Sequence, residues 1–314
     1  MTRRPRSRLP PHLPDLESQR PRDHAAPAAT RRGRLIAGRV TGPHARLGKS
    51  EISHAVARLT SGADDARLGL DLGTVTREDA WRAITDGWGW SGDGARALIQ
   101  PDLTLARFED ALARLRRVGA RGGRVAAATG RPASLLPLVR ALVAVAADAG
   151  AEVVACDRWG PFSGGRSLWW YDGVAVVTDG TALLADGGRA AGPEWLFATG
   201  RPDLVVADAG FAAASLAAGH ETVVLADLDV PVFGLAADRG LPACLVPLAL
   251  GCPPSAYLPL VEMTADAAAA AQAPARQGAD ELVKRGVPDA SAHLPHSTTR
   301  APEAYAHPES GGEG

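Results

Sequence analysis

The sequence predicts an α/β fold: a doubly wound, mostly parallel sheet with helices on both faces and a small β-meander insertion. Short continuous apolar runs alternate with segments of helical periodicity, which is the pattern of βαβ units. The 314 residues are 46% hydrophobic but only 5% aromatic, so small aliphatic side chains must fill the core. A chain of this length can form one large domain or two small ones.

The first predicted strand and helix lie near residue 70. The run Arg67–Asp71 (RLGLD) has the apolar character of a buried strand. Thr74 or Thr76 then offers a hydroxyl that can cap a helix running to about Asp86. This order places Asp71 at the carboxyl end of the predicted strand.

The next predicted elements are a helix, a strand, a loop and another helix. Thr104 opens a helix with one apolar face, which ends near Gly119. The strand Arg124–Ala128 follows, then the loop Thr129–Pro132 and a helix over Ala133–Ala147. Such alternation is typical of strands that pair in parallel.

The remaining strands fall into two groups. Glu152–Cys156 continues the alternation, but residues 159–187 hold strand-like runs separated by Asp-Gly turns, which predicts a meander or small insertion. Asp203–Asp208, Thr222–Asp227 and Ala243–Pro247 then return as short continuous strands separated by helical stretches.

Charge and composition divide the chain into three parts. Residues 1–34 hold nine Arg against three acidic residues, a local charge of +6, and we expect a disordered basic tail. Residues 271–314 carry a charge of −2 and are rich in Pro, Ala, Ser and Gly, which predicts a second disordered tail. The body, 35–270, is left with a charge of −5, which argues against a nucleic-acid groove on the folded domain.

No export or membrane signal is evident in the sequence. The first 34 residues lack an apolar stretch of about 7 to 15 residues, and no run of about 18 apolar residues occurs elsewhere. We therefore expect a cytoplasmic protein without membrane contact. Cys156, Cys244 and Cys252 show no C-x-x-C spacing, so we expect three free thiols.

Two familiar motifs are only approximated. Gly42–Ser50 resembles a Walker loop but has five residues between its glycines where four are needed, and it includes a Pro. Gly87–Gly92 satisfies G-x-G-x-x-G, yet it follows a predicted helix and carries two Trp residues. The chain has no G-x-S-x-G elbow, and no zinc-type spacing links His44, His54 and His220.

Polar residues at the predicted carboxyl ends of strands form the candidate site, because open α/β sheets bind ligands there. Thr129, Gly130 and Arg131 can hold a phosphate through backbone amides, a hydroxyl and a guanidinium. Carboxylates are the ligands of hard cations, which suggests Mg²⁺. The proposed metal ligands are Asp71, Asp208, Asp227 and Asp229. Acidic residues at these places also serve as helix caps, so the two interpretations stay open.

The body from Ile36 to Met263 resembles a family of uncharacterised actinobacterial proteins described as phosphatases. The likeness is carried by short pieces spread over the body. They are Ile36-Ala-Gly-Arg-Val40, Leu68-Gly-Leu-Asp71, Ala128-Thr-Gly-Arg-Pro132-Ala-Ser-Leu-Leu136, Pro202-Asp-Leu-Val-Val-Ala-Asp208, Ala226-Asp227 and Asp229-Val-Pro231. This resemblance implies that 35–270 is an α/β phosphatase-like domain.

Some of these pieces are also similar to haloacid-dehalogenase phosphatases. The segment around Asp71 looks like the nucleophile loop of that superfamily, the segment around Thr129 like its phosphate-binding threonine loop, and Asp208 like its metal-binding loop. The resemblance implies a metal-dependent phosphatase with Asp71 as nucleophile. Thr129 and Arg131 would then bind the phosphate.

This chain departs from those patterns at several places. Gly73 stands where the superfamily has a general-acid Asp, and between Thr129 and Asp208 only an Arg such as Arg189 could replace the expected Lys. Ala209 stands where the phosphatase family tends to have His. Two functions therefore remain: a phosphomonoesterase acting on an unidentified small phosphorylated metabolite, or a non-catalytic binder of such a metabolite. The sequence leaves the oligomeric state open.

Overall fold

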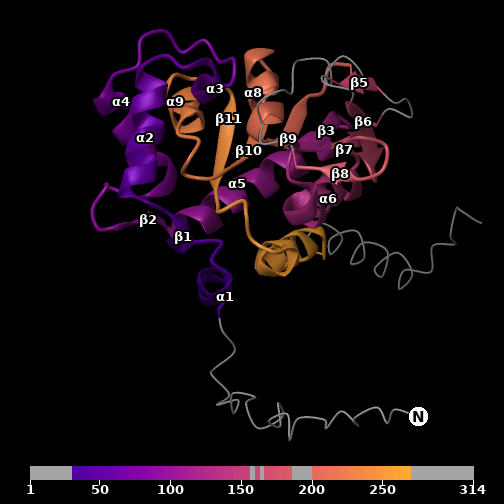
Figure 1. Ribbon diagram of the computed structural model, residues 1–314. Helices are drawn as coiled ribbons and strands as arrows, with labels where there is room; N and C mark the ends of the chain where they lie inside the picture. The colour runs from indigo at the N-terminus through magenta and orange to yellow at the C-terminus, as the bar shows by residue number, and fades with distance from the viewer. Residues whose placement is uncertain (1–29, 156–159, 163–165, 186–199, 270–314) are drawn as a thin grey trace, which may run out of the picture. The chain divides into compact units, whose positions relative to one another are not determined.

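The computed structural model describes residues 30–155, 160–162, 166–185 and 200–269 (Figure 1). The chain divides into two units, Met1–Ala269 and Ala270–Gly314, and all described residues lie in the first. No helix in the described ranges is long and apolar enough to cross a membrane. The elements are α1 (Arg31–Ala37), β1 (Gly42–Gly48), α2 (Lys49–Thr60), α3 (Asp64–Arg67), α4 (Arg77–Trp88), β2 (Arg96–Ile99), α5 (Pro101–Ala120), β3 (Arg124–Thr129), α6 (Pro132–Asp148), β4 (Glu152–Val153), β5 (Gly160–Phe162), β6 (Arg166–Tyr171), β7 (Val174–Thr178), β8 (Leu183–Leu184), β9 (Leu204–Asp208), α8 (Ala209–Ala217), β10 (Thr222–Ala226), α9 (Val232–Asp238), β11 (Ala243–Pro247) and η3 (Pro254–Tyr257), followed by a helical segment over 258–269.

A mixed sheet with the strand order β11-β10-β9-β3-β7-β6-β5 forms the centre of this unit. β3, β9, β10 and β11 run parallel, and β4 pairs in parallel with the start of β3. From β3 the chain continues to β4 on one side, whereas β9, β10 and β11 are added in turn on the other. The direction of winding reverses between β3 and β9, and such switch points are where open α/β sheets bind ligands.

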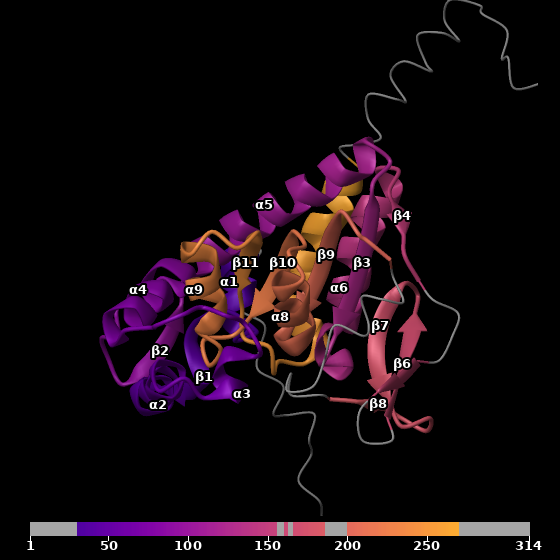
Figure 2. The same ribbon diagram turned by 90° about the horizontal axis from the view of Figure 1, so that it is seen from above.

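Helices cover both faces of the sheet, as predicted. α5 and α6 pack against each other on one face, while α8 and α9 lie on the other (Figures 1 and 2). α4 packs on α9, and α2 packs on α4. Right-handed crossovers place their helices on opposite faces when the direction of winding reverses, so this arrangement follows from the strand order.

The predicted meander is confirmed, but it is part of the main sheet and not a separate insertion. β5 to β8 pair antiparallel with their neighbours, and Asp172 and Gly173 form the turn between β6 and β7 with φ of 48° and 79°. β7 also pairs in parallel with Ala127, Ala128 and Thr129 of β3. This edge of β3 is available because β4 is only two residues long. Parts of the predicted meander lie outside the described residues.

The predicted strand Arg67–Asp71 is wrong. Its first residue ends the short helix α3, and Leu68 and Gly69 then have left-handed backbone conformations, with φ of 52° and 78°. Two successive residues with positive φ cannot continue an extended strand. Of the two apolar side chains that suggested a strand, Leu70 is buried and Leu68 is half-buried, and both belong to irregular backbone.

The start of one helix is as predicted and that of the next is not. Thr76 caps α4 by accepting a hydrogen bond from the backbone N–H of Asp79 at 3.1 Å. α5 begins at Pro101, a residue favoured at the first helical position, and not at Thr104. Thr104 is buried inside the helix, where its hydroxyl donates to the carbonyl of Pro247 at 2.6 Å and joins α5 to β11.

The folded unit begins earlier than the predicted tail 1–34 allows. Helix α1 starts at Arg31, whose guanidinium pairs with Asp266. Arg34 pairs with Glu262 at 2.6 Å, so both arginines contact the last described helical segment. Arginines counted as tail charge thus have partners in the fold. The rest of both predicted tails lies outside the described residues.

The Walker-like segment Gly42–Ser50 is strand β1 followed by the start of α2, an element pair that the sequence analysis did not assign. β1 pairs antiparallel with β2 in a small separate sheet. Gly and Pro are poor strand formers, and their presence in β1 weakens the strand pattern of the sequence. Within β1, His44 is buried while Ala45 and Arg46 are exposed.

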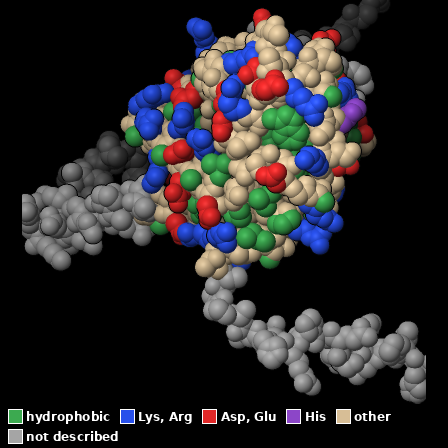
Figure 3. Space-filling view, turned by 90° about the vertical axis from the view of Figure 1, so that its left-hand side faces the viewer, with side chains coloured by type: hydrophobic (Ala, Val, Ile, Leu, Met, Phe, Trp, Pro, Cys, Tyr) green, Lys and Arg blue, Asp and Glu red, His purple; other side chains and the backbone are tan. Residues whose placement is uncertain are grey.

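The central strands are buried on both faces, and every residue of β9 and β10 is buried. Trp88 is fully buried and its indole N–H donates to the carbonyl of Ala226 at 3.2 Å, so the Trp in Gly87–Gly92 serves packing. Two of the three expected free thiols, Cys244 and Cys252, are free and buried, and Cys156 lies outside the described residues. Basic and acidic side chains are intermixed on the face shown in Figure 3.

Candidate functional site

Polar side chains gather at the carboxyl ends of β3, β9 and β10, beside the switch point. Thr129 ends β3, Asp208 ends β9, and Asp227 directly follows β10. The parallel register pairs Ala128 with Ala207, so the ends of β3 and β9 lie side by side. The fold therefore brings three of the residues that the sequence singled out to one edge of the sheet.

Asp208 organises the loop that follows β3. Its side chain is fully buried, and its carboxylate accepts hydrogen bonds from the Gly130 N–H at 2.7 Å and the Thr129 hydroxyl at 3.2 Å. The Thr129 hydroxyl oxygen in turn accepts from the backbone N–H of Arg131 at 3.0 Å. Burial raises the pKa of the Asp208 carboxyl, and the Arg131 charge and the Gly130 hydrogen bond oppose that rise. Asp208 thus positions residues 129–131 from inside the protein.

Asp227 is held by backbone groups and by a buried histidine. Its two oxygens accept hydrogen bonds from the N–H groups of Leu228 at 2.8 Å and Leu250 at 3.1 Å. Nε2 of His44 lies 3.0 Å from Oδ1, off the line of a regular hydrogen bond, so we treat the contact as electrostatic. Nδ1 of His44 accepts from two backbone N–H groups of β1, which places the imidazole proton on Nε2.

Asp229 differs from these two carboxylates because no group among the described residues donates a hydrogen bond to it. The surrounding protein raises the pKa of Asp229 by desolvation, and the negative charge of Asp227 raises it further. Arg131, His44 and Arg46 oppose the rise. The residue is nevertheless exposed to solvent at the surface, which moderates the shift. Asp229 is therefore a carboxyl group that can exchange protons with a ligand.

Two cavities meet at this edge, and Arg131 and Asp229 line both of them. The α2 cavity has a volume of about 290 Å³ and the α6 cavity of about 430 Å³. The α2 cavity is lined by Glu51, His54, Ala55, Arg58, Asp65, Ala66, Leu68, Arg131, Ala209, Asp229, Val230 and Pro231. The α6 cavity is lined by Arg46, Leu47, Arg131, Ala133, Ser134, Ala185, Asp227, Asp229, Leu250 and Gly251.

The α6 cavity has the features of an anion site. Ala133 and Ser134 belong to the first turn of α6, a 17-residue helix whose N-terminus carries partial positive charge. Arg131 and Arg46 add two guanidinium groups. Arg46 lies directly against the backbone of Gly251, where a Cβ atom would stand 2.2 Å from its Nη2.

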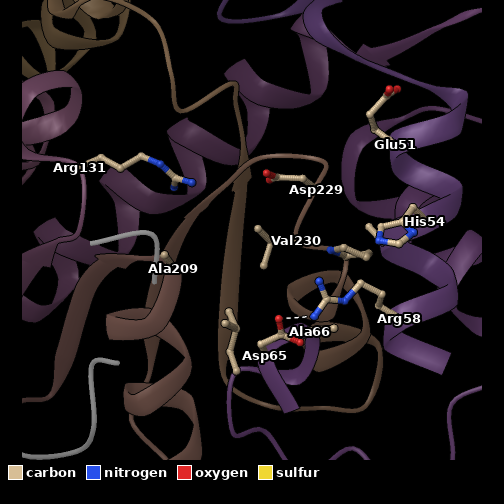
Figure 4. A pocket seen from close by; sticks show the side chains of 12 residues that line it. Glu51, His54, Arg58, Asp65, Ala66, Arg131, Ala209, Asp229 and Val230 are labelled. Atoms are coloured by element: carbon tan, nitrogen blue, oxygen red, sulfur yellow. Dashed lines mark hydrogen bonds and ion pairs between the residues drawn. The ribbon is translucent and has the colours of Figure 1, made fainter. Parts of the chain in front are cut away.

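The α2 cavity lies between helix α2 and the loop after β10 (Figure 4). Arg131 and Asp229 point toward one another on one side, and Glu51, His54 and Arg58 project from α2 on the other. The Arg58 guanidinium is paired with Asp65. Both signs of charge therefore face this cavity.

Asp71, the predicted nucleophile and metal ligand, lies outside both cavities. Its carboxylate is exposed and accepts a hydrogen bond from the Gly73 N–H at 3.1 Å, within the loop that replaces the predicted strand. Arg239 holds that loop by donating to the carbonyl of Thr74 at 2.7 Å. Because no strand carries Asp71 to the sheet edge, the structure does not bring it together with Thr129 and Asp208.

Gly73 and Ala209, two residues at which this chain departs from the family patterns, lie in different segments of the fold. Ala209, the first residue of α8, has a left-handed backbone with φ of 46°, and it contributes a methyl group to the wall of the α2 cavity. Gly73 also has positive φ, at 57°, in the loop of Asp71. Arg189 lies outside the described residues.

The predicted Mg²⁺ site with four carboxylates is not assembled. Asp71 is elsewhere, and the oxygens of Asp208 and Asp227 accept hydrogen bonds from protein groups. Within the part of the chain that the structure describes, no group of three or more His, Cys, Asp or Glu side chains could hold a metal ion. Of the predicted ligands, Asp229 has a carboxylate at both cavities to which no group in the described part of the chain donates a hydrogen bond. The donor set does not fit the predicted metal site, and Mg²⁺ stays a prediction.

His44 and Arg46 are site residues that the sequence analysis missed. They stand two positions apart in β1 and reach the site from a small sheet outside the main one. The sequence offered one indication: His44 and Arg46 are two positions apart, as residues on one face of a strand are. The glycines on either side suggested a Walker loop, so the segment was not identified as a strand.

Comparisons with known proteins point to one family. Residues 28–272 match the model of the family described as Phosphatase. The chain is 31% identical over 227 residues to "Phosphatase SCO2771" of Streptomyces coelicolor (strain ATCC BAA-471 / A3(2) / M145), in an alignment covering 68% of this chain and 85% of that protein. No solved structure matches the chain significantly.

Proposed function

The chain belongs to the Phosphatase family, and from this premise we propose that it hydrolyses a small phosphomonoester at the border of the α2 and α6 cavities. Family membership supports a hydrolase and does not favour the alternative of a non-catalytic binder. The observation that carries the assignment of the site is the guanidinium of Arg131, which lines both cavities.

Arg131 has unused capacity to bind an anion. Its Nη1 is buried and has no hydrogen-bond partner within the described residues. The nearest carboxylate oxygen, Oδ2 of Asp208, is 4.0 Å away, too far for a hydrogen bond. A buried donor without an acceptor is costly, and a phosphate oxygen would supply the acceptor. We infer that Arg131 binds the phosphoryl group of the substrate.

The phosphoryl group fits the α6 cavity better than the α2 cavity. The first turn of α6 and the guanidinium of Arg46 add positive potential there. Ser134 adds a hydroxyl at the same wall. In the α2 cavity the guanidinium of Arg58 is already paired with Asp65. The ester oxygen would then lie near Asp229, where the two cavities meet.

Asp229 is the proposed proton donor to the leaving group. Its raised pKa favours the neutral acid, which is the form that a general acid needs. Water attacks phosphorus, the bond from phosphorus to the ester oxygen breaks, and the Asp229 proton passes to that oxygen to give an alcohol and inorganic phosphate. Asp208 and Asp227 serve as positioning residues, because their oxygens are engaged within the protein.

The first test removes the phosphate contact. We expect the purified protein to release inorganic phosphate from p-nitrophenyl phosphate, and Arg131→Gln to lower kcat/KM by about 10² to 10³, as loss of a preorganised charge contact does. Arg117→Gln on the exposed side of α5 is the control and should retain activity. If the wild-type protein hydrolyses no phosphomonoester while still binding phosphate, the non-catalytic alternative is correct.

The second test concerns the proton. Asp229→Asn should reduce kcat/KM for an alkyl phosphate by about 10² or more and for p-nitrophenyl phosphate much less, because a nitrophenolate leaves without protonation. The wild-type rate with the alkyl ester should fall as pH rises through the raised pKa of Asp229, and the variant should lack this limb. Equal losses with both esters would contradict the role of general acid.

Asp71→Asn tests the earlier prediction of a nucleophile. Because Asp71 lines neither cavity, we expect near wild-type kcat/KM from this variant. A loss comparable to that of Asp229→Asn would restore Asp71 as the nucleophile. That result would also mean that the reaction takes place near Asp71 and not where the two cavities meet.

A further inference from the structure

The walls of the α2 cavity bear on which alcohol the enzyme releases, an inference that rests on the proposed function. With the phosphoryl group in the α6 cavity and the ester oxygen at Asp229, the alcohol portion extends into the α2 cavity. The volume of the α2 cavity, about 290 Å³, is just below the usual range for ligand sites, about 300 to 1,000 Å³. The leaving group is therefore small.

Among the described residues that line the two cavities, none is Phe, Tyr or Trp. Nucleobases and aryl rings are normally bound by stacking on aromatic side chains or on flat apolar surface. A flat ring in the α2 cavity would instead cover Glu51, Arg58 and Asp65 without replacing their hydrogen bonds to water. Each uncompensated group weakens binding, so nucleotides and aryl phosphates should bind here less well than esters whose alcohol carries hydroxyl groups.

The charges around the α2 cavity nearly balance. Glu51, Asp65 and Asp229 contribute carboxyl groups, while Arg58 and Arg131 contribute two guanidinium groups. The Arg58 guanidinium is neutralised locally by Asp65. Little net charge therefore remains to select a cationic or an additional anionic group on the alcohol. A neutral polar leaving group fits this balance best.

Glu51 and His54 supply polar groups from α2 to the wall of the α2 cavity. Hydrogen bonds from its own backbone N–H and from that of Gly48 lower the pKa of Glu51, so it stays a carboxylate acceptor. His54 lies one turn further along α2 and projects toward the same cavity (Figure 4). Hydroxyl groups both donate and accept, so one polyol can satisfy Glu51 and His54 together.

We propose that the substrate is a phosphomonoester of a small polyhydroxylated alcohol, such as a sugar or glycerol phosphate, whose hydroxyls bind Glu51 and His54 of α2. Glu51 and His54 are then specificity residues, whereas Arg131 and Asp229 serve every phosphomonoester. The residues that recognise the alcohol come from α2, and those that act on the phosphoryl group come from the sheet edge.

The test compares four esters. Glucose 6-phosphate and glycerol 3-phosphate represent the proposed class, AMP represents nucleotides, and ethyl phosphate has the same alkoxide chemistry without hydroxyls. We expect kcat/KM for one of the polyol esters to exceed those for ethyl phosphate and AMP by at least about tenfold, the effect of one hydrogen bond to a charged group. Equal or higher values for AMP or ethyl phosphate would overturn the proposal.

Two variants and one control test whether Glu51 and His54 cause the preference for polyol esters. Glu51→Gln keeps an acceptor for the Gly48 N–H and should reduce kcat/KM for the polyol ester at least fivefold more than for ethyl phosphate. His54→Ala, at an exposed position, should do the same and replaces Glu51→Gln if that variant melts early. Glu78→Gln in the first turn of α4 is the matched control and should change neither value.

The outcomes separate the two proposals. If ethyl phosphate or p-nitrophenyl phosphate is hydrolysed but Glu51→Gln and His54→Ala affect all esters equally, the phosphatase stands and the polyol class is wrong. If the wild-type protein hydrolyses none of these esters, the proposed function itself fails, and the substrate class falls with it.

Discussion

Replacement of Asp208 by Ala should destabilise the fold by about 2 to 6 kcal/mol at neutral pH. The carboxylate accepts hydrogen bonds from the Gly130 N–H and the Thr129 hydroxyl, and its side chain is fully buried. Each donor left without an acceptor inside a protein costs about 1 to 3 kcal/mol, and Ala leaves two of them. The loss is a large part of the stability of a typical domain, about 5 to 15 kcal/mol.

Asp208→Asn separates the hydrogen bonds from the charge. The amide oxygen can still accept from Gly130, and the amide group can still contact the Thr129 hydroxyl. We expect this variant to unfold within about 1 kcal/mol of the wild-type protein. Urea unfolding followed by circular dichroism measures both variants. If the Ala and Asn variants differ by less than about 1 kcal/mol, the two hydrogen bonds do not have the energy assigned to them.

The pH dependence identifies the contribution of the charge. Burial raises the folded-state pKa of Asp208 above its unfolded value, near 3.8, so the folded protein takes up the proton more readily. The stability that this proton contributes is present below the unfolded pKa and is lost as pH rises through the folded pKa. We therefore expect Asp208→Asn to gain stability relative to the wild-type protein from about pH 4 upward. A difference that does not change with pH would contradict this reasoning.

Three further predictions concern the sheet, the anion cavity and the metal. Val205→Asp places a charge in the middle of β9, which is buried on both faces, and should abolish soluble expression. The control Val205→Ala should yield soluble protein. Normal melting of the Asp variant would show that Val205 is not buried. Gly251→Ala should displace the Arg46 guanidinium and raise KM for a phosphomonoester about tenfold, with thermal stability nearly unchanged. An unaltered KM would show that Arg46 does not bind the substrate. Millimolar Mg²⁺ should leave the melting temperature unchanged in thermal shift assays. If Mg²⁺ raises the melting temperature of the wild-type protein but not of Asp229→Asn, the sequence-based prediction of a metal site is correct.

The sequence by itself determined the sheet and part of its edge. The runs that became β3, β9, β10 and β11 are continuous and apolar because parallel strands in this fold are covered on both faces. Polar residues that directly follow such runs must lie at one edge. Thr129, Asp208 and Asp227 could therefore be placed together without any coordinates.

Only the tertiary structure decided which of these residues face a ligand. Asp71 follows an apolar run too, but left-handed residues at 68 and 69 make that run a loop, and Asp71 lies outside both cavities. His44 and Arg46 come from a separate two-stranded sheet whose strands are more than 40 residues apart in the chain. A local pattern records burial and periodicity but not the position of distant segments. The contacts of a carboxylate with such segments decide whether it positions a loop, as Asp208 does, or remains open to a ligand, as Asp229 does.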